Sequence, residues 1–354
     1  MSATSLDDLY KRVAQKVLKE TVHLRKGEAV TVEAWTNGLG FARHAVAEAR
    51  AMGCTAIMIF EDEGAYVEGV RRAPKDSLGL MGKNEYGLLS ATDAYIFVPG
   101  QALGVYSKTL KPKELSDSTR YNSSWYDAAK KAGLRGARLV FGYVGRDMAG
   151  MLGKTVSEIT ARQLKAGLTD YRKISRDAGQ AAAHLDNGME VTVESSGTKL
   201  RFRVKGELEI EDGIIDDKDL ADGNNVAYVP PGLVTKQVDP DSVEGKVKVS
   251  QSLTRYGVLA GAELEFKGGT LTSWRAQDKA KLERLLATVP IGKRKLTLLG
   301  VGVNPELRYG FGQDRFVRGS VTLSGLGFTA VLRKSDLSSG GSRVVSQGVL
   351  VAGR

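Results

Sequence analysis

The sequence predicts an α/β protein with an N-terminal Rossmann- or flavodoxin-like parallel-sheet domain and a C-terminal strand-rich α+β domain. Three observations lead to this class: short apolar runs alternate with helical patterns in the first half, a long helical stretch follows, and strand-like runs dominate the remainder. Strands that are apolar throughout and are separated by helices are typical of a parallel sheet covered on both faces. A length of 354 residues is suited to two domains.

In the first half, helical spacing of apolar residues alternates with short β-like runs. Two of the helical patterns stop at Gly53 and Gly133, as a glycine just after a helix would cause. The predicted helices are 6–19, 41–52 and 123–132, and the predicted strands are 29–34, 55–60, 94–98 and 138–142.

The second half begins after a mostly helical stretch, residues 155–184, which we expect to bridge two domains. Period-two alternation on both sides of Ser195-Ser196-Gly197 predicts a β-hairpin of residues 189–194 and 200–204. The further predicted elements are strands at 243–249, 262–266, 271–274, 296–301, 318–323 and 328–332 and a helix at 277–287. The resulting domain prediction is 1–150 for the α/β layer, 151–185 for the helical bridge and 186–354 for the strand-rich domain.

Composition excludes several classes of protein. Hydrophobic residues make up 42% and charged residues 26% of the chain, which is typical of a globular protein and not of a disordered one. A single cysteine, Cys54, excludes a disulfide framework and a multi-cysteine metal site. No apolar leader and no membrane-length apolar run occurs, so we expect a cytoplasmic protein without a membrane partner.

Several short motifs follow one another along nearly the whole chain. They are the strand–helix–strand piece 30–60, Gly197-Thr198-Lys199-Leu200-Arg201-Phe202, Asp212-Gly213-Ile214, Gly223-Asn224-Asn225, Pro230-Pro231-Gly232, Gly300-Val301-Gly302-Val303-Asn304-Pro305 and Gly319-Ser320-Val321. No single motif is specific. In this order and spacing they resemble the thermophilic metallo-aminopeptidase family of the aminopeptidase T and aminopeptidase S type. The resemblance implies that family's fold, a homodimer or higher homo-oligomer, and a deep cavity lined by the C-terminal domain.

The resemblance also implies where metal ligands should lie, and the chain departs from the family at these positions. In the family a glutamate follows Pro-x-Gly, a second glutamate precedes the Gly-x-Gly turn by two residues, and a histidine follows Gly-Thr-x. These three positions hold Leu233, Leu298 and Thr322 here. The family's later ligand pair should fall in 328–332, which reads Phe-Thr-Ala-Val-Leu and contains no metal ligand.

The loss of these ligands predicts a protein without a metal cofactor. Zinc, cobalt and iron need several converging nitrogen or oxygen donors, and leucine has no lone pair to offer. We therefore expect an aminopeptidase T-like pseudoenzyme, with no assignable catalytic residue, that acts as a binding, scaffold or self-assembling protein. The leucines favour a peptide or a small apolar molecule as its ligand.

Two alternatives remain open at this point. In the first, the ligands are misplaced and the chain is an active aminopeptidase dependent on zinc, cobalt or manganese. The candidate carboxylates are then Glu263, Glu265, Glu306, Asp314 and Asp336.

In the second alternative, the net charge of +10 serves a basic RNA- or partner-binding module. The residues that suggest it are Lys108, Lys111, Lys113, Lys293, Arg294 and Lys295 for charge, and Tyr121, Trp125 and Tyr126 for base stacking. No signature of a nucleic-acid-binding fold occurs, so nucleic acid is the less favoured partner.

The remaining motifs are interpreted as structural. His23, His44 and His184 are expected to be surface or locally bonded residues, and Cys54 a core residue. Gly38-Leu39-Gly40 favours a tight strand-to-helix turn over a dinucleotide site, since the third glycine of that motif is missing. The acidic segment 207–222 is expected to be solvated, with a cation site at Asp212, Asp216, Asp217 and Asp219 as the alternative.

Overall fold

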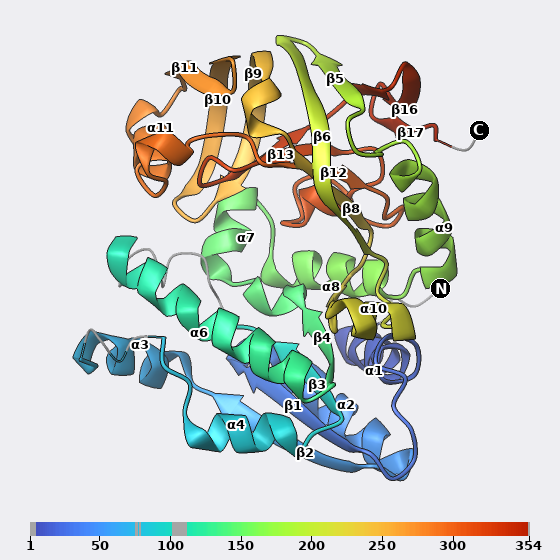
Figure 1. The fold of residues 1–354 in the computed structure, drawn as a ribbon. Coiled ribbons are helices and arrows are strands. Elements are labelled where there is room, and N and C mark those ends of the chain that lie inside the picture. The colour runs from blue at the N-terminus through green and yellow to red at the C-terminus, as the bar shows by residue number, and fades with distance from the viewer. Residues whose placement is uncertain (1–4, 75–76, 78, 101–111, 353–354) are drawn as a thin grey trace. The chain divides into compact units, whose positions relative to one another are not determined.

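A computed structural model of the chain describes residues 5–74, 77, 79–100 and 112–352 (Figure 1). The chain forms two compact units, Met1–Leu168 with Gly213–Pro230 and Thr169–Asp212 with Pro231–Arg354. This division differs from the predicted segments 1–150, 151–185 and 186–354, because the expected helical bridge is shared between the units. Residues 213–230 also return to the first unit, where they add a strand.

The first unit contains a five-stranded parallel sheet, as the sequence predicts. Its strand order is β2-β1-β3-β4-β7. The bounds are Ala29–Trp35 for β1, Thr55–Glu61 for β2, Ala94–Val98 for β3, Arg135–Leu139 for β4 and Val226–Val229 for β7. The predicted strand 138–142 is three residues too late, because Val140–Tyr143 form a 3-10 turn, η4. Gly142 permits this turn, since a Cβ on it would lie 2.2 Å from the Pro99 carbonyl oxygen.

The predicted helices of the first unit are present with shifted ends. The helices are α1 (Leu6–Lys16), which continues as the π-helix η1 (Val17–Thr21), η2 (Thr36–Gly38), α2 (Leu39–Ala51), α3 (Glu63–Arg72), α4 (Lys83–Ser90), α6 (Pro112–Lys131), α7 (Arg146–Leu152), α8 (Val156–Gly167) and α10 (Asp217–Asp222). The Ser5 hydroxyl caps α1 by accepting a hydrogen bond from the Asp8 N–H at 3.1 Å.

Helices cover both faces of this sheet. Leu9 and Val13 of α1 and Phe41 of α2 pack with Val32 and Ile96 in the larger core, on one face. On the other face, a smaller cluster joins residues of α4, β3 and α6, namely Leu89, Tyr95 and Ala129 with Leu134. Figure 1 shows α4 and α6 running across the same side of the sheet. The result is a three-layer α/β unit.

The second unit contains a twelve-stranded, antiparallel sheet system, which agrees with the predicted strand-rich domain. The strand order is β14-β13-β12-β8-β6-β5-β15-β16-β17, and β6 also pairs with β9, which continues to β10 and β11. The bounds are β5 (Glu190–Ser195), β6 (Thr198–Glu211), β8 (Leu233–Val238), β9 (Glu244–Thr254), β10 (Gly257–Lys267), β11 (Thr270–Arg275), β12 (Leu298–Gly302), β13 (Val321–Ser324), β14 (Thr329–Leu332), β15 (Asp336–Ser339), β16 (Ser342–Ser346) and β17 (Val349–Leu350). The predicted hairpin at Ser195-Ser196-Gly197 joins β5 to β6.

The helical stretch predicted at 155–184 is two helices and not one. α8 ends at Gly167, and α9 (Tyr171–Ala182) begins after Asp170, whose side chain accepts a hydrogen bond from the Lys173 N–H. The second unit also contains α11 (Lys279–Leu286) and the short turns η5 (Pro240–Ser242), η6 (Ile291–Lys293) and η7 (Asp314–Phe316). Ile174 and Ala178 of α9 and Leu282 of α11 belong to the core of this unit.

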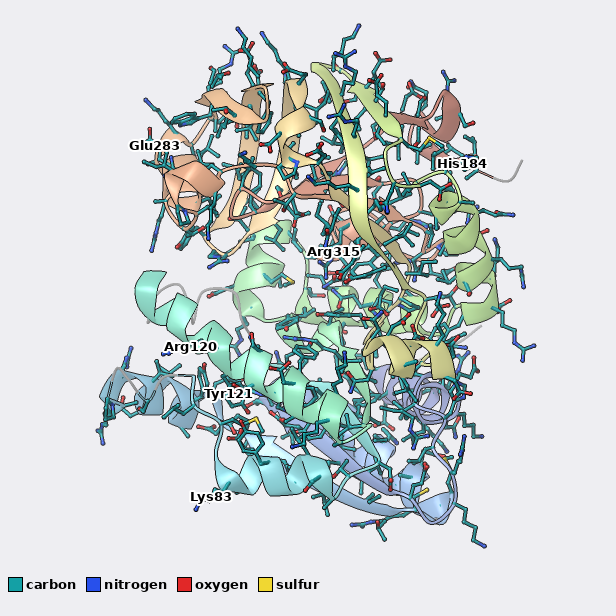
Figure 2. The ribbon with its side chains drawn as sticks, in the orientation of Figure 1. Lys83, Arg120, Tyr121, His184, Glu283 and Arg315 are labelled. Carbon is teal, nitrogen blue, oxygen red and sulfur yellow. The ribbon has the colours of Figure 1, made fainter. Side chains whose placement is uncertain are left out.

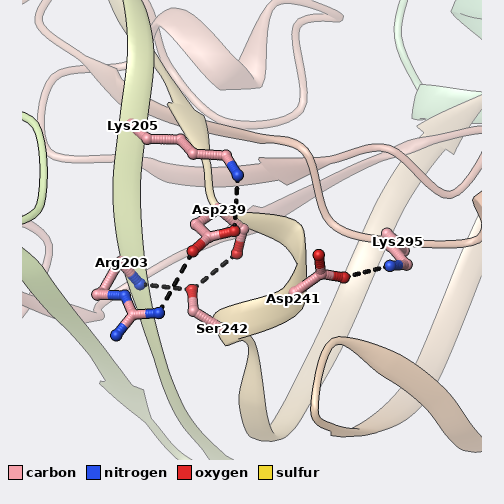
Figure 3. Close-up of polar contacts among 6 residues, drawn as sticks. All are labelled: Arg203, Lys205, Asp239, Asp241, Ser242 and Lys295. Carbon is pink, nitrogen blue, oxygen red and sulfur yellow. Dashed lines mark hydrogen bonds and ion pairs between the residues drawn. The ribbon is translucent and has the colours of Figure 1, made fainter.

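Polar contacts fix the end of β8 against β6 (Figure 3). Lys205 Nζ donates to Asp239 Oδ1 at 2.8 Å, and Arg203 Nη2 donates to Asp239 Oδ2 at 3.5 Å. The Ser242 hydroxyl accepts from the Arg203 N–H at 2.8 Å and donates to the Asp239 carbonyl at 2.7 Å. These contacts hold in register the part of the sheet that carries the candidate site. No helix in the described part of the chain is both long and apolar enough to cross a membrane.

Candidate functional site

The three positions where family ligands were expected lie on neighbouring strands of the second unit. Leu233 begins β8, Leu298 begins β12, and Thr322 is the second residue of β13. In the strand register, Leu233 is opposite Gly302 and Thr322 is opposite Gly300. Paired residues point to the same face of a sheet, as do alternate residues of one strand. The three side chains therefore share one face.

The side chains of Thr322 and Leu233 both approach Gly300, which has no side chain of its own. A Cβ built on Gly300 would lie 2.3 Å from Thr322 Oγ1 and 3.4 Å from Leu233 Cδ1. Both side-chain tips therefore lie against one glycine, although their residues are far apart in the sequence. Leu233 is 7% exposed and Thr322 is 4% exposed, whereas Leu298 is half-buried. The structure thus brings the predicted positions together, and we call this cluster the Gly300 face.

Val331, which the sequence analysis did not identify by itself, also belongs to the Gly300 face. Val331 of β14 pairs with Thr322 and so points to the same side, and it is 8% exposed. It lies in the segment 328–332, where the resemblance placed the later ligand pair. Leu233, Leu298 and Val331 contribute hydrocarbon to this face, and Thr235 and Glu211 share it through the strand register.

The donor set of the Gly300 face does not fit a zinc, cobalt or manganese ion. Leucine and valine supply no lone pair, and one neutral threonine hydroxyl is a weak ligand by itself. The carboxylates nearest in register belong to Glu209 and Glu211 of β6, opposite Thr235 and Leu233. Glu209 is exposed and accepts a hydrogen bond from the Thr235 hydroxyl at 3.4 Å. Within the described part of the chain, no three His, Cys, Asp or Glu residues gather as a metal site would require.

The motif residues that the chain retains have structural roles next to this face. Asn304 is fully buried, and its Nδ2 donates to the Pro231 carbonyl oxygen at 2.8 Å. Its Oδ1 accepts from the N–H groups of Glu306 and Leu307 at 2.9 and 3.2 Å. One side chain therefore ties the Gly-x-Gly-x-Asn-Pro turn to the Pro-Pro-Gly loop.

The glycines of these motifs are required by close backbone approach. Gly232 has φ +118°, and a Cβ on it would lie 2.8 Å from the Asn304 backbone nitrogen. A Cβ on Gly302 would lie 2.3 Å from the Val317 carbonyl oxygen and 2.7 Å from that of Arg315. Both positions exclude a side chain for reasons that are independent of metal binding.

Comparisons with known proteins agree with these motifs. The family model of the thermophilic metalloproteases (M29) matches residues 6–294. The chain belongs to the thermophilic metalloprotease family. No curated protein matches the sequence. The solved structure of wild-type AmpT from Thermus thermophilus is similar with a TM-score of 0.66 and 14% identity, over 98% of this chain and 100% of that chain.

The family-model match covers only part of the Gly300 face, whereas the structural similarity extends over 98% of the chain. Leu233 lies inside the matched span 6–294, whereas Leu298 and Thr322 lie beyond it. The similarity to AmpT extends over nearly the whole chain and shows that the fold is shared. At 14% identity it says nothing of the chemistry.

The alternative carboxylates lie on several elements, where Glu263, Glu265, Asp314 and Asp336 contact other residues. Glu263 accepts from Arg275 Nε at 2.8 Å, and Lys248 Nζ lies 3.7 Å from its other oxygen. Glu265, also on β10, lies 3.7 Å from Lys246. Asp314 accepts from the Gly310 N–H and from Arg333 Nη2. Asp336 accepts two hydrogen bonds from Gln347, both at 2.8 Å, and Glu306 is exposed in the turn after Asn304.

None of the three histidines belongs to the strands that carry the Gly300 face. His44 Nε2 is 2.9 Å from Asp7 Oδ1 on α1, and His23 is exposed with a φ of +45°. Figure 2 shows His184 at the end of α9. The described carboxylate candidates therefore form no cluster with a histidine.

Several of the residues that suggested a nucleic-acid surface contact other residues of the chain, whereas Lys293 is exposed. Lys295 pairs with Asp241, and Arg294 Nε donates to the Val289 carbonyl at 3.2 Å. Trp125 packs edge-on against Tyr95 and Tyr126, and the Tyr121 hydroxyl donates to Glu85 of α4. Figure 2 shows Tyr121 between α6 and α4. Lys108 and Lys111 lie outside the described residues, as does the side chain of Lys113.

The other predicted structural motifs are explained by packing. A Cβ on Gly38 would lie 2.6 Å from Val98 Cγ1, as expected for a tight strand-to-helix turn. Cys54 is 7% exposed, which confirms it as a core residue, and burial raises the pKa of its thiol. Asp216 and Asp219 cap α10 by accepting each other's backbone N–H at 2.9 and 3.1 Å.

Proposed function

We propose that this member of the thermophilic metalloprotease family no longer hydrolyses peptides and acts as a binding or scaffold protein. The observation that carries the proposal is the composition of the Gly300 face, where Leu233, Leu298 and Thr322 stand at the expected ligand positions. A hydrolytic metal centre needs carboxylates that offset the charge of its ions and orient a bound water. Two leucines in their place supply hydrocarbon only.

The pattern of what is kept and what is lost supports this proposal. Asn304, Gly232 and Gly302, which hold loops together, are retained. The positions where side chains would face a metal carry apolar or neutral groups. The hydrocarbon face suits a peptide side chain or another small apolar group as ligand.

Turnover assays and restored ligands test the proposal. The wild-type protein should show no release of p-nitroaniline from leucine p-nitroanilide with added Zn²⁺, Co²⁺ or Mn²⁺. The variant Leu233→Glu/Leu298→Glu/Thr322→His should gain Co²⁺-dependent thermal stabilisation. A control with the same new residues at exposed sites, Met189→Glu/Ile291→Glu/Thr270→His, should not. Metal-dependent turnover by the wild-type protein would refute the proposal.

We also propose that the protein self-associates through the edge strand β2. β2 ends the order of the parallel sheet, and its Ile57, Met58 and Phe60 are 50, 48 and 48% exposed. An edge strand with large exposed apolar side chains favours pairing with a second copy. In light scattering, Met58→Glu/Phe60→Glu should lower the particle mass. The control Ile291→Glu, at an apolar residue that is 81% exposed in the second unit, should leave the mass unchanged.

A further inference from the structure

A pocket of about 650 Å³ opens in the first unit at the carboxyl ends of the parallel strands. Its lining includes Glu33 of β1, Glu61 of β2, Phe97 of β3, Arg138 of β4 and Tyr121 of α6. A smaller hollow of about 70 Å³ adjoins it and shares Glu33, Phe97, Tyr121 and Arg138 in its wall. The volume of the larger pocket lies in the range of roughly 300–1,000 Å³ that small-molecule sites occupy.

The topology places this pocket where α/β sheets bind ligands. In the order β2-β1-β3-β4-β7, the chain leaves β1 toward β2 on one side and returns to β3 on the other. The reversal of strand order lies between β1 and β3, and ligands of open α/β sheets bind outside the carboxyl ends of the strands at such a point. Glu33 and Phe97, which line the pocket from these two strands, are direct register partners.

Two side chains of opposite charge, Glu33 and Arg138, line this pocket from register-aligned positions on β1 and β4. Glu33 is opposite Phe97, and Phe97 is opposite Arg138, so all three side chains point to the same face. Neighbouring strands are about 4.8 Å apart, which separates the backbones of Glu33 and Arg138 by roughly 10 Å. In the described part of the chain neither residue forms an ion pair, with the other or with any third residue.

The Arg138 guanidinium is partly buried among neutral groups. Its Nη atoms donate to the hydroxyls of Tyr126 and Tyr143, and it lies 5.4 Å from the Phe97 ring centroid and 5.9 Å from that of Tyr228. Its Nε is buried and has no hydrogen-bond partner among the described residues. A buried cation without an anion is costly, so the arrangement suits an anionic group that arrives with a ligand.

Among the described residues, Glu33 has no cationic partner either. The Tyr95 hydroxyl donates a hydrogen bond to Glu33 Oε2, and the Trp35 side chain also interacts with this carboxylate. Burial raises the pKa of Glu33, and the nearby charge of Glu61 raises it further. A cationic group placed beside these carboxylates would offset both effects. The buried indole of Trp35 lies in the same pocket.

Aromatic rings form much of the remaining wall. Tyr66 packs edge-on against Trp35 with centroids 5.2 Å apart, and Tyr95 packs in the same way against Trp125. Tyr121 and Phe97 lie between these pairs in the lining of both hollows. Such walls favour a flat apolar or aromatic group.

We propose that this pocket binds a small zwitterion of the α-amino acid type, with its ammonium group at Glu33, its carboxylate at Arg138 and an aromatic side chain against Phe97 and Tyr121. The site lies in the first unit and does not depend on the proposed loss of the metal centre in the second. No covalent step is involved.

Three ligands that differ only in charge test the proposal on the wild-type protein by titration calorimetry. L-Phenylalanine carries both charges, 2-phenylethylamine only the ammonium group and 3-phenylpropionate only the carboxylate. L-Phenylalanine should bind saturably at one site per chain, and each analogue should bind at least about tenfold more weakly. No saturable binding of L-phenylalanine, or equal binding of either analogue, would overturn the proposal.

Variants then assign the two charges. Glu33→Gln and Arg138→Met should each weaken L-phenylalanine binding by about tenfold or more, since each removes one charge partner. Arg135→Met is the matched control, because Arg135 is on the same strand but pairs with Glu28 at 2.7 Å on the opposite face. Unchanged binding by both pocket variants would overturn the assignment. Should a variant fail to fold, the comparison of ligands on the wild-type protein still decides the matter.

Discussion

Asn304 Nδ2 donates a hydrogen bond to the carbonyl oxygen of Pro231 at 2.8 Å, across 73 positions of sequence. This contact joins the two turns that flank the Gly300 face, and it explains why an asparagine is kept where nearby ligand positions are not. The same side chain accepts two backbone N–H groups. The asparagine of the Gly-x-Gly-x-Asn-Pro turn is therefore, in this chain, a structural clamp.

The clamp predicts a graded loss of stability. Asn304→Ala leaves the Pro231 carbonyl and two buried N–H groups without their partner, so the free energy of unfolding should fall by about 2–4 kcal/mol. Asn304→Asp keeps an acceptor for the two N–H groups but buries a carboxylate against the Pro231 carbonyl oxygen, so it should lose at least as much. Asn224→Ala, at an exposed asparagine, should change the free energy of unfolding by less than about 0.5 kcal/mol. Urea denaturation measures all three, and equal values for Asn304→Ala and Asn224→Ala would contradict the clamp.

Gly232 predicts a second loss of stability, for which Gly179 provides the control. Gly232→Ala forces a side chain into a positive-φ position 2.8 Å from the Asn304 nitrogen, so unfolding should become easier by about 2–4 kcal/mol. Gly179→Ala places the same methyl group in α9, where nothing lies within 4 Å, and should stabilise by about 0.5–1 kcal/mol. Thermal denaturation of both variants tests the opposite signs. A loss from Gly179→Ala as large as that from Gly232→Ala would show that the strain is not local.

The Asp239 contacts in Figure 3 predict a pH effect. The hydrogen bond from Lys205 lowers the pKa of Asp239 below its usual value of 3.8, so the ionised form stabilises the fold above that value. This contribution is lost as the pH falls through the lowered pKa. Lys205→Met should therefore cost about 0.5–1 kcal/mol at pH 7 and less as the pH falls below about 3.5. Lys199→Met is the control and should cost less at pH 7, because the Lys199 side chain is 87% exposed and its Nζ lies 3.9 Å from Glu194. A cost for Lys205→Met that is independent of pH would contradict the ion-pair account.

Glu33 predicts a pH effect of the opposite sign. Its pKa is raised from 4.5, mainly by burial, so the folded protein loses stability as the pH rises through that raised pKa. Glu33→Gln should raise the Tm of the ligand-free protein at pH 7 by a few degrees, and the gain should vanish below about pH 4. Glu48→Gln, which touches only Lys11 at 4.0 Å among described charges, should not raise it. Differential scanning calorimetry across this pH range measures the gain, and a constant or negative difference would contradict the burial of an unpaired carboxylate.

The sequence predicts the elements with strong local patterns and misses those that depend on distant partners. β1 and β3 are almost entirely apolar and were predictable, whereas β8 carries Lys236 on its core face. That lysine is 4% exposed and donates to Asn187 Oδ1 at 2.7 Å and to the Gly206 carbonyl at 2.8 Å. A buried lysine interrupts the pattern by which a strand is recognised. β7 is missed because four residues give too short a signal.

The Gly300 face and the pocket of the first unit also differ in how far the sequence could predict them. Leu233, Leu298 and Thr322 could be located from the sequence, because glycines and prolines beside them fix the register of the motifs. Val331 could not be singled out, since its place follows from pairing with Thr322. The row of Glu33, Phe97 and Arg138 is set by pairing between strands that are distant in sequence. No local spacing contains that information.

Metal stoichiometry of the unmodified protein tests the central claim most directly. Purified wild-type protein, never exposed to a chelator, would be dialysed to equilibrium against micromolar Zn²⁺, Co²⁺ or Mn²⁺ and analysed by plasma mass spectrometry. A face made of Leu233, Leu298 and Thr322 predicts retention of well below one ion per chain. Retention of one or two ions per chain, lost when the Gly300 face is altered by Thr322→Val, would contradict it.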